Sequence, residues 1–247
     1  MEPHIVLGKK DIHRLSDIDF KEGVAILVDK PREWTSFNVV SKFRYVIRHH
    51  LGLKKFKIGH AGTLDPLATG LLILCAGKYT KRATEFMGME KEYMGTITLG
   101  ATRPSFDMET EVDQVFSYDH IDQVQVEKSL EEFTGEIMQV PPVYSAKQVD
   151  GKRAYRSARA GKELEMQACP VHIRELECTR LELPEMDFRT KCSKGTYIRS
   201  LANDLGKALD SGAYLSELRR TMIGEFNVED ALSIDDFVEA LKQERAI

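Results

Sequence analysis

The sequence has few of the residues that hold metals or disulfide bridges. Its cysteines number four and show neither a zinc-site spacing nor a disulfide framework, so each is expected to be a buried, small hydrophobic residue: Cys75, Cys169, Cys178 and Cys192. The seven histidines include no HExxH pair. The sequence therefore predicts no metal site and no cofactor.

Long apolar runs are also missing. No stretch approaches the ~20 apolar residues of a membrane-spanning helix, and the N-terminal MEPHIVLGKK lacks the apolar core of a signal peptide. With 42% hydrophobic and 30% charged residues, the composition is that of a folded globular protein and not of a disordered one. We therefore expect a cytoplasmic protein without membrane contact.

Nucleotide-binding patterns are absent as well. There is no GxGxxG, and GKYT at Gly77 would need glycine at position 72 and Ser or Thr at 79, where the chain has Leu72 and Tyr79. A phosphate-binding loop is excluded. The strand and helix patterns interleave without an even βαβ rhythm, which predicts an α+β fold with a mixed sheet.

What the sequence does have is an uneven distribution of charge. The net charge is −4, yet residues 42–57 contain six Lys or Arg and no acid, and residues 152–162 contain five and no acid. Residues 107–132 and 229–239 are acidic. Either basic stretch alone could be a solvated helix surface, but two of them favour contact with RNA, because phosphates respond to the local field.

Hydrophobic periodicity places the main elements. Strands are expected at 24–28, 71–77, 93–101, 171–183 and 188–192, and helices from Ser36 to about residue 47, at 78–87, at 121–133, from about residue 198 to 209, and at 234–241. Ser36 is the expected helix cap. Residues 141–170 are polar and irregular, which is typical of a functional or mobile segment.

The most informative loop is GHAGTLDPLATGLL, at 59–72. Loops on rigid strands often hold active sites. Asp65 has a second interpretation, however, because Asp followed by Pro is also a common helix start, and residue types alone favour that ordinary cap.

Four motifs in order, DKPREWTSF, GHAGTLDPLATGLL, KEYMGTITLG and SKGTYIRSLANDLG, resemble those of the bacterial tRNA pseudouridine-55 synthase family, TruB. The resemblance extends from about residue 24 to 224. It implies the pseudouridine synthase fold, a largely antiparallel mixed sheet with flanking helices in one catalytic domain over 1–247. It also implies an insertion at about 141–170 that closes on the RNA.

The resemblance assigns roles to matching positions. Asp65 is similar to the catalytic aspartate, and the substrate-binding residues implied are His60, Tyr93, Tyr197, Arg199 and Leu218. The candidate contacts to the RNA backbone are Lys30, Lys152, Arg153 and Arg156. The expected partner is the T-arm of tRNA, with no protein partner required.

The implied reaction gives these residue types a physical purpose. Uridine must leave its stack to react, and an aromatic side chain such as Tyr93 can stack on the everted base. A guanidinium such as that of Arg199 can keep the Asp65 carboxylate ionised despite burial. Two alternatives stay open, a tRNA-folding chaperone with secondary catalysis and a guide-dependent synthase.

The sequence also departs from the family pattern. Glu33 stands where the family usually has glycine, so the turn there is expected to differ. The PUA-type RNA-binding domain found in many members is not expected in this chain, which predicts weaker contact with the acceptor arm.

Overall fold

The chain folds into two compact units. The computed structural model describes residues 5–145, 148–149, 152–153 and 166–245. The first unit comprises Met1–Lys91 and Arg219–Ile247, and the second comprises Glu92–Leu218. β5 and β13 each have residues in both units, so the two units share these strands. The expectation of one catalytic domain over 1–247 stays a prediction.

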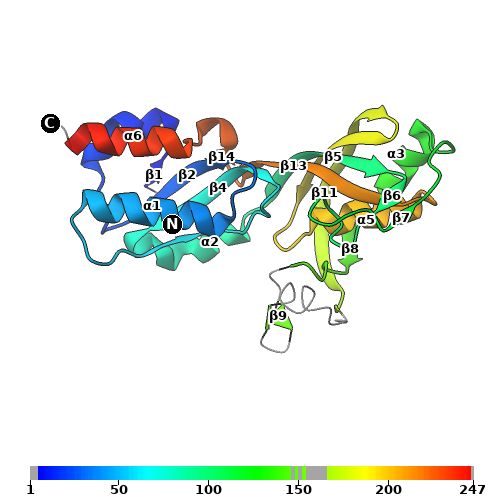
Figure 1. Cartoon of the computed structure of the whole chain (residues 1–247), viewed down its shortest axis with the longest axis horizontal. Coiled ribbons are helices and arrows are strands. Elements are labelled where there is room, and N and C mark those ends of the chain that lie inside the picture. The colour runs from blue at the N-terminus through cyan, green and yellow to red at the C-terminus, as the bar shows by residue number, and fades with distance from the viewer. Residues whose placement is uncertain (1–4, 146–147, 150–151, 154–165, 246–247) are drawn as a thin grey trace. The chain divides into compact units, whose positions relative to one another are not determined.

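The first unit is built on strands that run through its middle (Figure 1). Its elements are β1 (Val6–Leu7), the 3-10 helix η1 (Lys9–Asp17), β2 (Val24–Lys30), α1 (Ser36–His50), β3 (Ile58–His60), β4 (Thr69–Ala76), η2 (Gly77–Arg82), α2 (Ala83–Gly88), β14 (Phe226–Asn227), η3 (Val228–Asp230) and α6 (Ile234–Arg245). β4 pairs antiparallel with β2 and β3 and parallel with the end of β13 (Ala213–Ile223), while β1 is parallel to β2.

Helices cover both faces of this sheet. Alternate residues of β2 and β4, such as Ile26 and Leu74, join a core with α1 and α6, where the Phe43 and Phe237 rings stack 4.4 Å apart. The intervening residues, such as Ile73, join a second core with η2 and α2. Coverage of both faces explains the continuous apolar run of β4 and confirms the predicted buried strand.

The second unit contains the longer antiparallel strands. Its elements are β5 (Lys91–Leu99), β6 (Ala101–Thr102), β7 (Gln114–Val115), α3 (Gln123–Glu132), β8 (Gly135–Gln139), β9 (Gln148–Val149), β10 (Lys152–Arg153), β11 (Cys169–Glu182), β12 (Glu185–Cys192), α5 (Ile198–Ala208) and most of β13. The strand order is β13-β5-β12-β11-β8, with β11 antiparallel to both β12 and β8.

The fold class is confirmed, and the differences from expectation are local. A mixed, largely antiparallel arrangement with flanking helices is present in the described residues. The segment 78–87 forms a 3-10 helix followed by a short α-helix, and both β8 and β13 were not predicted. Cys75 and Cys192 are buried free thiols as expected, whereas Cys169 and Cys178 are only half-buried.

Candidate functional site

The loop between β3 and β4 carries Asp65 on a turn and not on a helix. The amide of Ala68 donates to the Asp65 carbonyl over 3.2 Å, with Pro66 at the second position of the turn, where proline is favoured. Residues 61–68 contain no helix, so the interpretation of Asp65 as a helix cap is wrong. The Asp65 side chain is half-buried, which suits a group that must meet a substrate.

One buried serine fixes the residue just before Asp65. Ser36, the first residue of α1, accepts a hydrogen bond from the Leu64 amide at 2.9 Å and donates to the Leu64 carbonyl at 3.1 Å. The cap of α1 is Thr35, whose hydroxyl accepts from the Asn38 amide at 3.0 Å. The prediction of Ser36 as the cap is therefore wrong, because Thr35 caps the helix and leaves Ser36 to hold the loop.

Lys30, at the end of β2, holds the residue just after Asp65. Its side chain is fully buried, and its ammonium donates to the carbonyls of Pro31 at 2.8 Å, Trp34 at 2.7 Å and Pro66 at 3.3 Å. Burial lowers the pKa of Lys30 to about 8, opposed by the attraction of the Asp65 carboxylate. The expected contact of Lys30 with the RNA backbone does not fit, since the three ammonium protons all have carbonyl acceptors.

The end of β13 supplies two arginines that the sequence analysis missed. Arg219 and Arg220 pair with Thr69 and Gly70 of β4, and successive strand residues point to opposite faces. Arg219 forms a two-pronged ion pair with Asp29, at 3.0 and 2.8 Å. A side chain at Gly70 would lie 2.3 Å from the Arg220 carbonyl, and Gly70 has φ of +102°, so only glycine fits there.

Arg220 ties together the two ends of the Asp65 loop. Its side chain is 1% exposed, with Nε donating to the Leu71 carbonyl at 2.7 Å and Nη2 to the Gly62 carbonyl at 3.2 Å. Its charge acts on both Lys30 and His60. Asp65 therefore sits on a loop that is held by two buried cations and one buried hydroxyl.

His60 lies at the end of β3, next to this loop. Burial, and secondarily the charge of Arg220, lowers the pKa of His60. The imidazole is therefore neutral at pH 7. Its Nδ1 is buried and finds no hydrogen-bond partner among the described residues.

The other predicted site residues belong to the second unit. Arg199 lies in the first turn of α5 as expected and is 4% exposed. It donates to the carbonyls of Ser105 at 3.2 Å and Tyr144 at 3.0 Å, and its Nε is 3.6 Å from an Asp107 carboxylate oxygen. These contacts fix the guanidinium. Its pairing with Asp65, which belongs to the first unit, stays a prediction.

Three further predicted residues of the second unit lie on different elements. Tyr197 precedes α5, and its amide and carbonyl are both bound by the Gln139 side chain, at 2.8 and 3.1 Å. Tyr93 is 9% exposed in β5, and Leu218 is half-buried in β13. Their contact with an everted base stays a prediction.

The expected RNA-closing segment falls mainly outside the described residues. Lys152 and Arg153 form β10, which pairs antiparallel with β9. Arg156 lies outside the described residues. Their contacts with an RNA backbone, and the boundaries of the insertion at 141–170, stay predictions.

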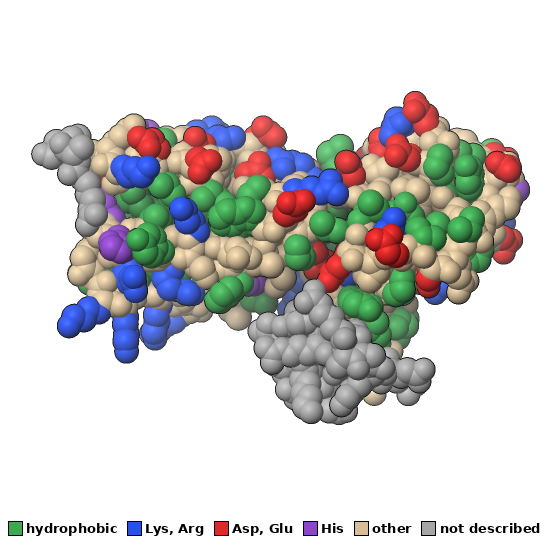
Figure 2. Space-filling model, in the orientation of Figure 1, with side chains coloured by type: hydrophobic (Ala, Val, Ile, Leu, Met, Phe, Trp, Pro, Cys, Tyr) green, Lys and Arg blue, Asp and Glu red, His purple; other side chains and the backbone are tan. Residues whose placement is uncertain are grey.

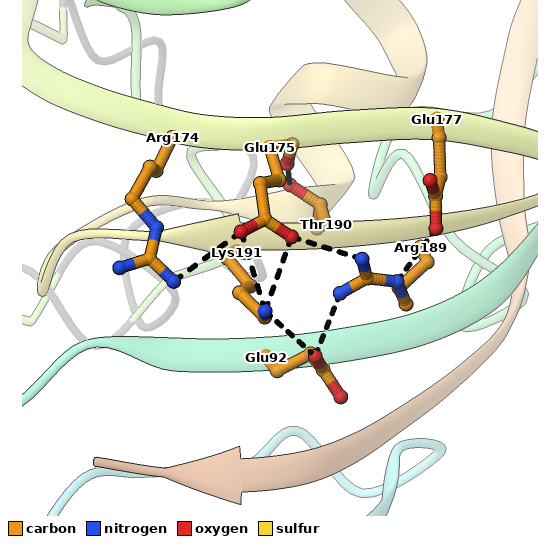
Figure 3. A network of polar contacts seen from close by, with 7 residues as sticks. All are labelled: Glu92, Arg174, Glu175, Glu177, Arg189, Thr190 and Lys191. Atoms are coloured by element: carbon orange, nitrogen blue, oxygen red, sulfur yellow. Dashed lines mark hydrogen bonds and ion pairs between the residues drawn. The ribbon is translucent and has the colours of Figure 1, made fainter.

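Other charges of the second unit neutralise one another. Arg189 on β12 binds Glu92 at 2.8 Å, Glu175 at 2.9 Å and Glu177 at 2.6 Å, while Lys191 binds Glu175 at 3.1 Å (Figure 3). Hydrogen bonding from Lys191, together with Arg189, lowers the pKa of Glu175. The network joins β5, β11 and β12, so these cations are committed to carboxylates of their own sheet.

Two other kinds of feature are absent from the described part of the chain. No group of three or more His, Cys, Asp or Glu side chains is placed to hold a metal ion. No described helix has the length and apolar character needed to cross a membrane.

Sequence comparison finds close relatives. The model of the TruB family pseudouridylate synthase N-terminal domain matches residues 48–198, and that of the tRNA pseudouridylate synthase B C-terminal domain matches 199–246. The tRNA pseudouridine synthase B of Flavobacterium johnsoniae is 53% identical over 91% of this chain and 98% of its own length. That of Chlorobaculum tepidum is 42% identical over 92% and 94%.

Structure comparison gives more distant matches. A chain in the crystal structure of a Cbf5-Nop10-Gar1 complex is 28% identical, with a TM-score of 0.68 over 94% of this chain. A chain in the structure of an H/ACA RNP bound to a substrate RNA containing 2'-deoxyuridine is 27% identical, with a TM-score of 0.65 over 92%. This chain spans only 58% and 56% of those two chains.

Proposed function

The chain belongs to the TruB family of pseudouridylate synthases, and we propose that it converts uridine 55 in the T-loop of tRNA to pseudouridine, with Asp65 as the catalytic carboxylate. The observation that carries the proposal is the anchored loop. Asp65 is half-buried between Leu64, held by Ser36, and Pro66, held by Lys30. Such an anchor keeps a reactive group in one geometry, as catalysis requires.

The reaction makes defined demands on this carboxylate. The bond between ribose C1′ and uracil N1 breaks, C1′ joins C5, the C5 proton leaves and N1 gains a proton. Asp65 acts as an anion, whether on the sugar or on the base. Lys30, whose charge interacts with that of Asp65, favours the ionised carboxylate. The buried Arg220, bound to Gly62 and Leu71, adds a second positive charge beside the loop.

Binding of the everted nucleotide falls to the second unit in this proposal. Tyr93 stacks on the base, which offsets part of the few kcal/mol that unstacking costs. Tyr197 and Leu218 line the pocket, and Arg199, already fixed by Asp107, meets the Asp65 carboxylate. The names of the relatives that match over nearly their full length favour tRNA over a guide-dependent substrate.

Tritium release tests the role of Asp65. A tRNA transcript that carries tritium at C5 of its uridines should lose tritium with the wild-type protein and not with Asp65→Asn. Asp210→Asn is the matched control, because Asp210 is exposed and its φ of +50° is tolerated by asparagine. Equal release by Asp65→Asn and wild type would remove Asp65 from the chemistry.

A second transcript tests the substrate. Replacing uridine 55 by cytidine should abolish tritium release while leaving the other labelled uridines in place. Continued release would show that another position is the target. Turnover on the bare transcript would also exclude a requirement for a guide RNA or a protein partner.

A further inference from the structure

The solvent face of α1 is unusually rich in cations and rings. Its buried residues, Ser36, Val39, Val40, Phe43 and Ile47, all lie on one side of the helix. At 100° per residue, Lys42, Tyr45, Arg48 and His49 fall on the opposite side, within about 60° of Tyr45. The helix thus presents a separate polar surface that the first unit does not use for its core.

Tyr45 is the centre of this surface. Its side chain is 54% exposed, although aromatic rings usually gain from burial. The His49 ring lies 4.6 Å from the Tyr45 ring, and the Arg48 guanidinium carbon is 6.0 Å from it. An exposed ring among cations is the arrangement on which unpaired bases stack in proteins that bind single-stranded nucleic acid.

The loop after α1 extends the positive charge. Lys54, Lys55 and Lys57 are exposed, and Arg44 of α1 donates to the Ile58 carbonyl at 3.1 Å, which ties the end of the loop to the helix. Lys and Arg side chains project where this loop runs below α1 (Figure 2). We call Lys42, Tyr45, Arg48, His49, Lys54, Lys55 and Lys57 the α1 patch.

The four lysines of the α1 patch have no acidic partner within 4 Å among the described residues. No acidic residue occurs in the sequence between Glu33 and Asp65. Within the part of the chain that the structure describes, the acid found against residues 42–57 is Glu244 of α6, 3.8 Å from His50. Glu239 of α6 pairs instead with Lys242 of its own helix, at 3.6 Å. Lys42, Lys54, Lys55 and Lys57, which are all exposed, therefore form a cluster of one sign.

The α1 patch is close enough to the Asp65 loop to serve the same molecule. Ser36, at the start of α1, contacts Leu64, and Arg48 lies twelve residues further along the helix. At 1.5 Å per residue this is about 18 Å. A few nucleotides cover such a distance, so an RNA with its target at Asp65 can lie along α1.

We propose that the α1 patch binds the RNA segment that flanks the target nucleotide, with Tyr45 stacking on an unpaired base and the surrounding cations contacting phosphates. The proposal rests on the function proposed above and adds a second contact to it. An acidic protein or a membrane would satisfy the charge alone, whereas the exposed ring between cations favours RNA.

Charge removal tests the phosphate contacts. One variant carries Lys42→Gln, Lys54→Gln, Lys55→Gln and Lys57→Gln, and the control carries Lys21→Gln, Lys81→Gln, Lys128→Gln and Lys242→Gln, four exposed lysines elsewhere. The probe is a tRNA transcript with cytidine at the target position, measured by fluorescence anisotropy at several salt concentrations. For the patch variant, the slope of log affinity against log salt concentration should be smaller in magnitude by about 3 than for the wild type. For the control variant, the slope should change much less.

Ring removal tests the stacking. Tyr45→Ala should weaken binding of the same transcript by about 5- to 100-fold, and Tyr45→Phe should keep wild-type affinity. Alanine is the best helix former, so the helix is not weakened. Wild-type affinity for Tyr45→Ala, or equal slopes for the two quadruple variants, would overturn the proposal.

The two proposals fail in different ways. Tritium release from the uridine transcript reports the reaction, and anisotropy with the cytidine transcript reports the patch. Patch-dependent binding without tritium release by the wild type would overturn the proposed function only. Tritium release by the wild type with patch-independent binding would overturn the α1 patch only.

Discussion

Replacing Ser36 by alanine should uncouple the Asp65 loop from α1. The change removes both hydrogen bonds to Leu64, in a place where Ser36 is 2% and Leu64 4% exposed. A buried backbone group left without a partner costs about 1–3 kcal/mol. The loop can avoid this cost only by moving its amide and carbonyl toward water, and that movement displaces Asp65.

The magnitude for catalysis follows from the same two bonds. If they favour the anchored loop by about 2 kcal/mol, their loss reduces the ratio of anchored to released loop by about 30-fold, since 1.36 kcal/mol is a factor of ten, and the rate falls by up to that factor. The loss of unfolding free energy should stay below about 2–6 kcal/mol, the full cost of two unpaired buried groups, because the loop relaxes instead of holding these groups in place.

The neighbouring residue provides the control. Thr35→Ala removes the cap of α1, which costs about 1 kcal/mol, and leaves the Ser36 contact with Leu64 intact. Urea unfolding gives the stability of each variant, and single-turnover tritium release at saturating enzyme gives the chemical rate. Ser36→Ala should be slow and Thr35→Ala should be close to wild type. If both variants react at the wild-type rate, the anchoring of the loop by Ser36 does not matter for the reaction.

Three further predictions concern charge and backbone. The pKa of Lys30 is lowered to about 8 from 10.5, so the unfolded chain binds more protons than the folded chain between these two pH values. The free energy of unfolding, measured with urea, should therefore rise with pH in that window. Lys30→Met should lack this rise. Glu33 has φ of +68°, a conformation that costs a non-glycine residue about 1–2 kcal/mol. Glu33→Gly removes this cost but makes the unfolded chain more flexible, so the unfolding free energy should rise by up to about 1 kcal/mol. The pKa of Glu175 is lowered, so its ion pairs with Arg189 and Lys191 stabilise the folded chain above the ordinary pKa of a glutamate. This stabilisation is lost as the pH falls below that value. Glu175→Gln should therefore make thermal unfolding less dependent on pH in the acid range.

Glu33 stands where the family usually has glycine, and its backbone has the left-handed conformation that glycine adopts readily. Its amide donates to the Pro66 carbonyl at 2.8 Å. The expected difference of this turn from that of the family stays a prediction. The tertiary contact with the Asp65 loop holds the turn, and the side chain is exposed.

Local patterns predicted β2, β4, α1 and α5 well because each has strong periodicity and strong end signals. β13 was missed because charged residues interrupt its alternation, as in ELRRT. In such a stretch, the sequence pattern predicts that Arg220 is a surface residue. It is buried because β13 pairs with β4, and the carbonyls of Gly62 in the Asp65 loop and of Leu71 in β4 accept hydrogen bonds from its guanidinium.

Sequence alone determined the family, the fold class and the position of the loop that holds Asp65, since these depend on motifs and on hydrophobic periodicity. Only the tertiary structure decided how that loop is held, because Lys30, Ser36 and Arg220 lie 28 or more residues along the chain from the loop residues that they bind. Lys30 and Ser36 would otherwise be an RNA contact and a helix cap. Their roles follow from the physical rule that a buried polar group must find a partner, and only the folded chain shows which partner is within reach.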